Sequence, residues 1–553
     1  FWMKTEHAPE AELILHGGPI LTMDEPSRIE AVAVGQGRIL AAGSLASALS
    51  FRTPATRVVD LCGKTLLPGF VDAHSHFIDT SIRTAWVDLR STPLGSVKSI
   101  GDMVELLSLC AEGTRPGEWI VGWGYDDTNI AELRHPTRLD LDRASSSHPI
   151  VLQHISGWVT ASNSLALARA GLDDSVEDTE TTVFRRMEDG SLSGVIEASI
   201  CPVLSKVAPP GDEEVIQSLA CGSAMYLAKG CTTAQEGWIA DPVWITQARK
   251  ALEQGYLRVR LVLYPLAQGT SLDNYHKLFP VAPSGTSLDK DMRLILGASK
   301  LSADGSIQAY TGYLAQPYHI CPQGKEAYRG YPSNDPAYLA SRIENLHRMG
   351  VQIAVHCNGD AAIDMALDAL EKAQAAYPRR DARHIIIHSQ MARDDQIERM
   401  ARLGIVPSFF AAHIYYWGDR HYHIFMGPER ARRMSPAGSA LRCGIPFTLH
   451  NDTYVTPIDP LGLVWAAVNR TSSGGLDLGR KEQGIPVLEA LKAVTIHAAR
   501  QGFEEERKGS IAKGKMADLV VLDKNPCDVD PMEIRDIRVT ATLVAGKVEY
   551  GSL

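Results

Sequence analysis

Both ends of the chain carry short apolar segments separated by glycine-rich turns. These segments lie at residues 11–24, 29–44, 56–69, 509–523 and 539–551. Runs of this length and alternation, broken by glycine, are typical of small antiparallel sheets. Neither end is long enough to bury a sheet face alone, so we predict one small β-sandwich domain built from residues 1–66 and 506–553 together.

The middle of the chain has a different period. Short apolar or β-branched runs alternate there with long amphipathic stretches such as residues 360–377, where Ile363, Leu367 and Leu370 recur at helical spacing. The strand-like runs begin at residues 69, 231, 259, 293, 351, 384, 405 and 446. Eight parallel strands are the number that closes a TIM (β/α)8 barrel, so we predict an α/β fold with this barrel in residues 67–505.

The segment between the first two of these runs is far longer than an ordinary connection in a βα unit. It contains strand-like sequences at 119–127 and 149–158, and helical patterns near 101–112 and 212–229. We therefore predict an inserted subdomain, residues 77–215, after the first barrel strand and over the barrel mouth.

Composition narrows the class of protein and of partner. Hydrophobic residues make up 45% of the chain and charged residues 22%, which is typical of a soluble globular protein. The net charge of -10 gives no basic footprint, so we expect a small-molecule substrate and neither nucleic acid nor a membrane as partner. The nine cysteines are odd in number and form no CxxC pair. Together with the lack of a signal-like or membrane-spanning apolar run, this predicts a reduced, cytoplasmic protein, with a homodimer as the default assembly.

Residues that can bind a metal ion gather where the predicted strands end. The set comprises His74, His76, Lys300, His356, His388 and Asp452. Carboxyl ends of barrel strands share one rim, and residues two apart on a strand point the same way, so these side chains are expected to meet there. Imidazole and carboxylate groups are ligands for zinc and similar ions. Taken singly, each residue is explained as well by packing, a turn or a solvated charge; their shared position favours a metal site.

Several motifs resemble the amidohydrolase superfamily of metal-dependent hydrolases, and within it the branch called amidohydrolase family 3. They are GFVDAHSHF at 69–77, VHCNGDAAID at 355–364, IIIHSQ at 385–390, LHNDTYVTPIDPL at 449–461 and GSIAKGKMADLVVLD at 509–523. The stretch from Phe410 to Arg470 is similar to N-substituted formamide deformylases of that branch. The resemblance covers essentially the whole chain.

The resemblance implies a metal centre with four histidine ligands. His74, His76, His356 and His388 would bind one or two divalent ions, with zinc the first candidate over manganese, iron or cobalt. A lysine ammonium has no lone pair for a metal. In two-metal members of the superfamily the equivalent of Lys300 is carboxylated and bridges the ions. Glu236, at the end of the second strand, is the rival bridge, and this alternative stays open.

The same resemblance assigns Asp452 as both a metal ligand and the catalytic proton shuttle. The expected reaction is hydrolysis of a carbon–nitrogen bond in a small amide, an N-substituted formamide or another N-acyl compound, by a metal-activated hydroxide. A cyclic amide, a carbamate or an ester is the alternative substrate on the same site. A barrel that binds a metal or ligand without catalysis is the alternative of another class, and Asp452 is the residue that such a binder would not need.

Five further residues are predicted to contact the substrate. They are Trp158, His154, Glu236, His413 and Trp417. Trp158 stands where the branch usually carries a histidine, so an aromatic wall would replace a polar contact there and favour an apolar substituent on the substrate. His450, two residues before Asp452, is expected to be structural.

Overall fold

The computed structural model describes residues 10–155, 157, 159–179, 182–198, 201–270, 272–279, 281–322 and 325–553. The chain divides into two compact units. The first consists of Phe1–Thr80 with Leu219–Leu553, and the second of Ser81–Ser218. The second unit lies close in sequence to the predicted insertion of 77–215. The three-part division at 66/67 and 505/506 stays a prediction.

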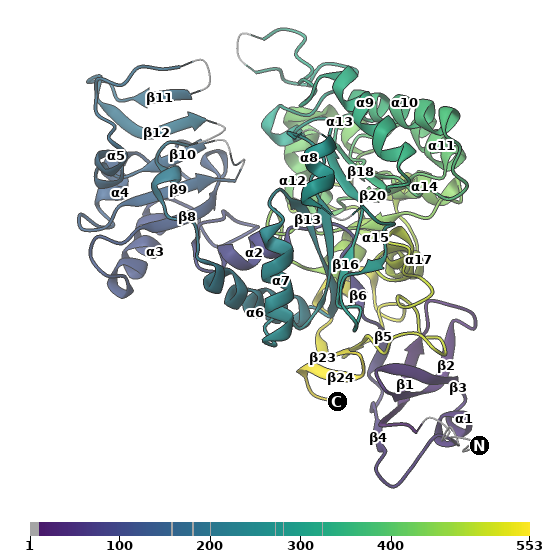
Figure 1. Cartoon of the computed structure of the whole chain (residues 1–553). Coiled ribbons are helices and arrows are strands. Elements are labelled where there is room, and N and C mark those ends of the chain that lie inside the picture. The colour runs from purple at the N-terminus through teal and green to yellow at the C-terminus, as the bar shows by residue number, and fades with distance from the viewer. Residues whose placement is uncertain are drawn as a thin grey trace. The chain divides into compact units, whose positions relative to one another are not determined.

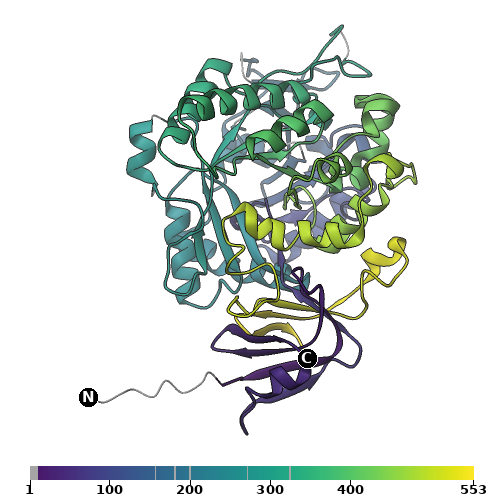
Figure 2. The same cartoon turned by 90° about the vertical axis from the view of Figure 1, so that its right-hand side faces the viewer.

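Strands from both chain ends form one eight-stranded sheet. Its members are β1 (Leu13–Leu21), β2 (Arg28–Gly35), β3 (Arg38–Gly43), β4 (Arg57–Asp60), β5 (Thr65–Pro68), β22 (Leu519–Leu522), β23 (Val539–Val544) and β24 (Lys547–Gly551). The two ends meet where β22 pairs antiparallel with β5, and the purple and yellow strands lie side by side in Figure 2. The association of the two ends is therefore as expected, whereas the two-layer sandwich stays a prediction.

Strand alternation explains why this sheet is stable. Successive residues of a strand point to opposite faces. Leu13, Leu15 and Val32 accordingly lie in one apolar cluster, and Ile14 and Ala31 lie in another. Both faces of β1 and β2 are therefore covered.

The parallel strands of the first unit form two sheets. In chain order they are β6 (Phe70–Val71), β13 (Cys231–Ile239), β14 (Arg260–Pro265), β16 (Leu294–Leu296), β17 (Ser299–Ser302), β18 (Ile353–Cys357), β19 (Ile385–His388), β20 (Val406–Phe409) and β21 (Thr448–Leu449). One sheet has the order β15-β16-β14-β13-β6, where β15 (Thr286–Ser287) is antiparallel, and the other has β17-β18-β19-β20-β21. All eight predicted strand positions are thus occupied by strands.

The prediction that the fourth strand is one continuous run from residue 293 is wrong. It is divided into β16 and β17 at Gly297 and Ala298. A Cβ at Gly297 would lie 2.2 Å from the ring of Tyr264, so the chain passes this ring only as glycine. β16 pairs with β14 and β17 with β18, and a closed eight-stranded ladder is not formed among the residues that the structure describes.

Backbone contacts nevertheless join the ends of the two parallel sheets. Leu266, just after β14, forms a parallel bridge with Lys300 of β17. At the other edge, the Asp452 amide donates to the His74 carbonyl at 3.0 Å and the His76 amide donates to the Thr453 carbonyl at 2.7 Å. The loops after the first and last strands are therefore held against each other.

Helices alternate with these strands, as expected. They include α7 (Val243–Glu253), α8 (Leu272–Leu278), α9 (Pro336–Arg348), α10 (Asp360–Ala376), α11 (Asp394–Leu403), α12 (Ala412–Arg420), α14 (Ala437–Arg442), α15 (Pro460–Asn469), α17 (Val487–Ala493) and α18 (Ile496–Gln501). Figure 1 shows α9, α10 and α11 side by side along the outside of the strands. The helix predicted at 360–377 is confirmed, and it buries Ile363, Leu367 and Leu370.

The second unit is a six-stranded sheet with helices of its own. Its strands follow the order β11 (Thr182–Arg186), β12 (Leu192–Ala198), β10 (Val159–Ser162), β9 (Ile150–His154), β8 (Ile120–Tyr125) and β7 (Val87–Asp88). Its helices include α3 (Ile100–Gly113), α4 (Arg138–Asp142) and α5 (Ser164–Ala170). Within the described residues, no helix has the length and apolar character needed to cross a membrane.

Candidate metal centre

The six predicted metal-binding side chains lie on five strands or the loops that follow them. His74 and His76 follow β6, Lys300 lies in β17, and His356 lies in β18. His388 ends β19 and Asp452 follows β21. Parallel strands bring their carboxyl ends to one edge of a sheet, and the loops after β6 and β21 are hydrogen-bonded to each other. Residues far apart in the chain therefore meet: the Thr453 amide donates to Ser75 Oγ, 378 positions away.

His74 and His76 both direct Nε2 toward Asp452. The distances to Asp452 Oδ1 are 3.8 Å from His74 Nε2 and 3.4 Å from His76 Nε2. The outer nitrogens have other partners: His74 Nδ1 lies 2.7 Å from Gln235 Oε1, and His76 Nδ1 lies 3.5 Å from Glu236 Oε1. Amide and carboxylate oxygens accept hydrogen bonds, so the Nδ1 atoms carry protons and the Nε2 atoms are the ones that face Asp452.

The Gln235 amide cannot be turned around without losing a bond. Its Nε2 donates to the Ala73 carbonyl at 2.7 Å, which leaves Oε1 to face His74. The tautomer of His74 is therefore set by a residue next to Glu236 on β13. The sequence pointed to Glu236 alone and did not identify Gln235.

His356 and His388 face each other on adjacent parallel strands. His388 Nε2 lies 3.0 Å from His356 Nδ1. On the far side, His356 Nε2 lies 3.2 Å from the Gly305 carbonyl oxygen and His388 Nδ1 lies 3.1 Å from His450 Nε2. The inner atoms of the pair are thus His356 Nδ1 and His388 Nε2.

A hydrogen-bond chain behind His388 fixes its tautomer as well. His450 Nδ1 lies 2.8 Å from Ser408 Oγ, Ser408 Oγ lies 2.8 Å from Thr448 Oγ1, and Thr448 donates to Gln501 Oε1 at 2.7 Å. Gln501 Nε2 donates to the Ala73 carbonyl, so its Oε1 is the chain's terminal acceptor. Because the chain ends on this acceptor, each group donates its proton to the next one toward Gln501, and His388 Nδ1 donates to His450 Nε2. The Nε2 lone pair of His388 is therefore left on the inner side. His450 is thus a contact of His388, a role that its spacing from Asp452 could have suggested.

Lys300 and Glu236 lie differently with respect to these inner atoms. Lys300 Nζ is 3.2 Å from His74 Nε2 and the side chain is fully buried. Burial lowers the Lys300 pKa to about 7, although the nearby Asp452 carboxylate opposes the shift. Glu236 instead accepts from the backbone amides of Ile78 at 2.8 Å and Trp238 at 3.2 Å, in addition to its contact with His76.

The electrostatics of Asp452 and His76 are coupled. Burial alone would raise the pKa of Asp452, but the hydrogen bond and charge of His76 hold it far below its ordinary value. Burial lowers the pKa of His76, but the hydrogen bonds that His76 donates to Asp452 and Glu236 outweigh this effect and raise the pKa to about 9. Asp452 also has a φ of +52° and His388 a φ of +70°, a region that side chains other than glycine seldom adopt. Such backbone strain at two of the proposed ligands is typical of functional sites.

The donor set fits a divalent metal ion. Histidine ligands in metal sites usually hold their second ring nitrogen in a hydrogen bond, and each of the four histidines does so here. The nitrogens of His74 and His76 and a carboxylate oxygen of Asp452 all lie within 4.8 Å of one another.

The predicted substrate-binding residues lie in different parts of the structure. His413 and Trp417, four residues apart on α12, are both buried, and the His413 ring lies 6.5 Å from the His388 ring and 5.4 Å from Trp417. His154 belongs to the second unit, where its Nε2 lies 3.1 Å from Asp127 Oδ1. Trp158 lies outside the described residues. The contacts of all these residues with a substrate stay predictions.

Known proteins resemble this chain over nearly its full length. Protein YtcJ of Bacillus subtilis (strain 168) is 28% identical over 97% of this chain and 99% of its own. N-substituted formamide deformylase of Arthrobacter pascens is 27% identical over 98% of each chain. The crystal structure of an uncharacterized metal-dependent hydrolase from Pyrococcus horikoshii OT3 superposes with a TM-score of 0.73 at 24% identity, covering 94% of this chain and 99% of that one.

These likenesses decide the fold class and the family. The structural likeness indicates a TIM-barrel-like α/β fold, in agreement with the parallel strands and alternating helices described above. The model of a family described as the amidohydrolase family matches residues 57–550, most of the chain. The chain therefore belongs to the amidohydrolase family, and it is a hydrolase that acts on carbon–nitrogen bonds other than peptide bonds.

Proposed function

We propose that the chain hydrolyses a small amide with the help of one or two divalent ions, of which zinc is the first candidate. The ligands would be His74, His76, His356, His388 and Asp452, with Lys300 between them. The observation that carries this proposal is the arrangement of the four imidazoles, each with its outer nitrogen hydrogen-bonded and its inner nitrogen turned toward another of the proposed ligands. When bound, the ion supplies a water of lowered pKa and polarises the carbonyl oxygen of the substrate.

Lys300 is proposed to carry the bridge as a carbamate. Burial brings its pKa to about 7, so a substantial fraction of the amine is neutral at neutral pH and can attack CO2. A bond forms between Nζ and the carbon of CO2, one proton leaves the nitrogen, and an anionic group with two oxygens results. The rival, Glu236, already accepts two backbone amides and contacts His76 from the outer side, which supports Lys300 as the bridge.

Asp452 is proposed to move the proton that the reaction requires. Its carboxylate lies 3.4 Å from His76 Nε2, and its pKa is held low, so it is ionised and able to accept a proton from the attacking water. The same carboxyl group would then donate this proton to the departing nitrogen, because an amine leaves poorly as an anion.

For the substrate we propose an N-substituted formamide or another N-acyl compound with an apolar substituent. The buried rings of Phe410 and His413 lie beside His388, and the buried Trp417 ring contacts both of them; this supports an apolar neighbour for the reacting carbon. The formamide deformylase from Arthrobacter pascens, similar along its whole length, supports the same class. Cyclic amides, carbamates and esters are the alternatives, because the same attacking water and shuttle would serve them.

The decisive experiment combines metal analysis with turnover. Wild type, Asp452→Asn and a control with an exposed aspartate replaced, Asp273→Asn, are purified after growth with added zinc and assayed against N-alkyl formamides, other N-acyl amines, cyclic amides and aryl esters. We expect Asp452→Asn to keep at least one ion per chain and lose turnover by a factor of about 10²–10⁴, as for removal of a proton-transfer group. Full activity in Asp452→Asn would contradict the role of Asp452 as proton shuttle. Wild-type protein purified without metal would contradict metal-dependent hydrolysis itself.

A separate measurement tests the bridge. Intact-protein mass spectrometry under native conditions should find a mass increase equal to one CO2 in wild type and none in Lys300→Ala. A wild-type mass without this increase, together with metal loss in Glu236→Gln, would transfer the bridge to Glu236.

A further inference from the structure

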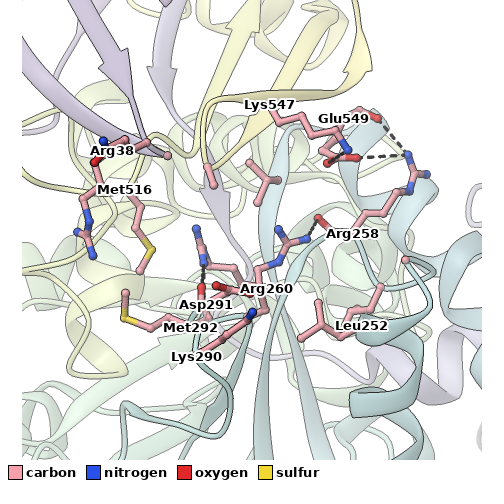
Figure 3. Close-up of a pocket in the computed structure, with 17 residues that line it drawn as sticks. Arg38, Leu252, Arg258, Arg260, Lys290, Asp291, Met292, Met516, Lys547 and Glu549 are labelled. Carbon is pink, nitrogen blue, oxygen red and sulfur yellow. Dashed lines mark hydrogen bonds and ion pairs between the residues drawn. The ribbon is translucent and has the colours of Figure 1, made fainter. Parts of the chain in front are cut away.

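A pocket of about 590 Å³ lies in the first unit, away from the histidines. Arg260 begins β14 and Arg293 directly precedes β16, so the pocket is at the amino ends of these strands, whereas His356 and His388 lie toward the carboxyl ends of theirs. Figure 3 shows the opposite wall, where Arg38 begins β3 and Lys547 begins β24 of the terminal sheet.

The pocket is lined mainly by positive charge. Its cationic side chains are Arg38, Arg258, Arg260, Lys290, Arg293 and Lys547, and its acidic ones are Asp291 and Glu549. The chain as a whole carries a net charge of -10, so this excess runs against its overall composition. Focused positive potential in a concave surface attracts anions.

Half of these cations are neutralised by carboxylates. Arg260 forms a buried pair with Asp518, with Nε 2.6 Å from Oδ2. Glu549 lies 3.2 Å from Lys547 and 3.8 Å from Arg258.

The other three cations are Arg38, Lys290 and Arg293. No carboxylate of the described residues forms an ion pair with any of them, and the remaining acid of the lining, Asp291, is exposed. The lining therefore keeps uncompensated positive charge.

Arg293 carries the strongest sign of a missing partner. One of its terminal nitrogens donates to the Arg258 carbonyl at 2.6 Å, but its buried Nε has no acceptor within the part of the chain that the structure describes. Burial and the nearby Arg260 guanidinium lower the Arg293 pKa and outweigh the opposing charges of Asp518, Glu549 and Asp289, three residues within the described ranges that form no ion pair with Arg293. A buried donor without an acceptor and two adjacent like charges are unfavourable, and an anion would relieve both.

We propose that this pocket binds a small organic phosphate. The phosphate would lie among Arg38, Lys290 and Arg293, because guanidinium groups bind phosphate oxygens through two parallel hydrogen bonds and lysine adds a point charge. The organic part would lie against the apolar side chains of the lining, which are Leu252, Leu257, Met292 and Met516. The volume lies in the range of small-molecule sites.

Isothermal titration calorimetry of the full-length, metal-containing protein tests the proposal. The probes are adenosine 5′-monophosphate, inorganic pyrophosphate and, as the uncharged control, adenosine. We expect adenosine monophosphate to bind at least tenfold more tightly than adenosine, and its affinity to fall as the KCl concentration rises. Equal affinities for adenosine monophosphate and adenosine would overturn the proposal. So would a lack of binding by both adenosine monophosphate and pyrophosphate.

Two variants localise the binding. Lys290→Glu reverses an exposed charge and should weaken binding of adenosine monophosphate at least tenfold, and Arg293→Met should do the same. The matched control Lys372→Glu changes an exposed lysine of α10 outside the pocket and should leave the affinity unchanged. Arg293→Met removes a backbone contact, so thermal unfolding is measured alongside; Lys290→Glu gives the answer if Arg293→Met does not fold. Unchanged affinity in folded Lys290→Glu would place the anion elsewhere, including at the metal centre, and would contradict the proposal.

Discussion

Gln235 offers a sharp test of how the metal centre is organised. Replacing it by leucine removes the oxygen 2.7 Å from His74 Nδ1 while keeping a side chain of similar size at a buried position. The Ala73 carbonyl loses the Gln235 donor but keeps a second one from Gln501 at 2.9 Å. Tyr264 likewise loses a contact with Gln235 and keeps one with Gln501. The main loss therefore falls on His74, whose ring can then rotate or carry its proton on the nitrogen that faces Asp452.

The expected magnitude follows from this outer contact. Removing the hydrogen-bond partner of a histidine ligand weakens metal binding about 10- to 100-fold. At about 1.4 kcal/mol for each factor of ten, this corresponds to about 1.4–2.8 kcal/mol of metal-binding free energy. The range matches the cost of about 1–3 kcal/mol for leaving a buried donor unsatisfied.

The assay is a competition titration. Metal-free Gln235→Leu and wild type are titrated with zinc against a colorimetric chelator, and circular dichroism confirms that both are folded. Gln235→Glu keeps an acceptor for His74 Nδ1 and should retain wild-type affinity or exceed it. Gln254→Leu, at the exposed end of α7, serves as the surface control. A folded Gln235→Leu with the zinc affinity of wild type would refute the assignment of His74 Nε2 as the metal-facing atom.

Further predictions concern stability. Asp518→Asn breaks the buried pair with Arg260 and should lower the free energy of unfolding by about 3–5 kcal/mol, measured by urea denaturation. Burial would raise the Asp518 pKa, but Arg260 outweighs it and lowers the pKa. The pair therefore stabilises the fold above the unfolded-state pKa of about 3.9, and the difference between wild type and Asp518→Asn should shrink as the pH falls below it; a constant difference would contradict this. Leu367→Ala on α10 should cost about 2–5 kcal/mol, whereas Lys372→Ala, exposed on the same helix, should stay within about 0.5 kcal/mol; equal losses would refute the assigned buried face.

Local patterns were sufficient to locate the elements. The period of apolar residues predicted the helix at 360–377 and all eight strand positions, because side chains repeat every two residues on a strand and about every 3.6 on a helix. The break within the fourth strand was not predictable in this way. It depends on the ring of Tyr264, which lies against Gly297 only once β14 and β16 have paired.

The order of the strands along the chain was enough to predict which side chains could meet at the metal centre. Parallel strands bring their carboxyl ends to one edge, so counting strands was enough to group His74, His76, Lys300, His356, His388 and Asp452.

The contacts that hold each of these side chains come from residues far away in the chain and became visible only in the folded protein. Gln235 is 161 residues from His74, and His450 is 62 residues from His388. The orientation of Glu236 away from the inner atoms also depends on contacts between distant residues, and so does the cationic pocket, which five separate segments of the chain form. Hydrogen bonds and charges act over a few ångströms in space, whereas periodicity describes only neighbours along the chain.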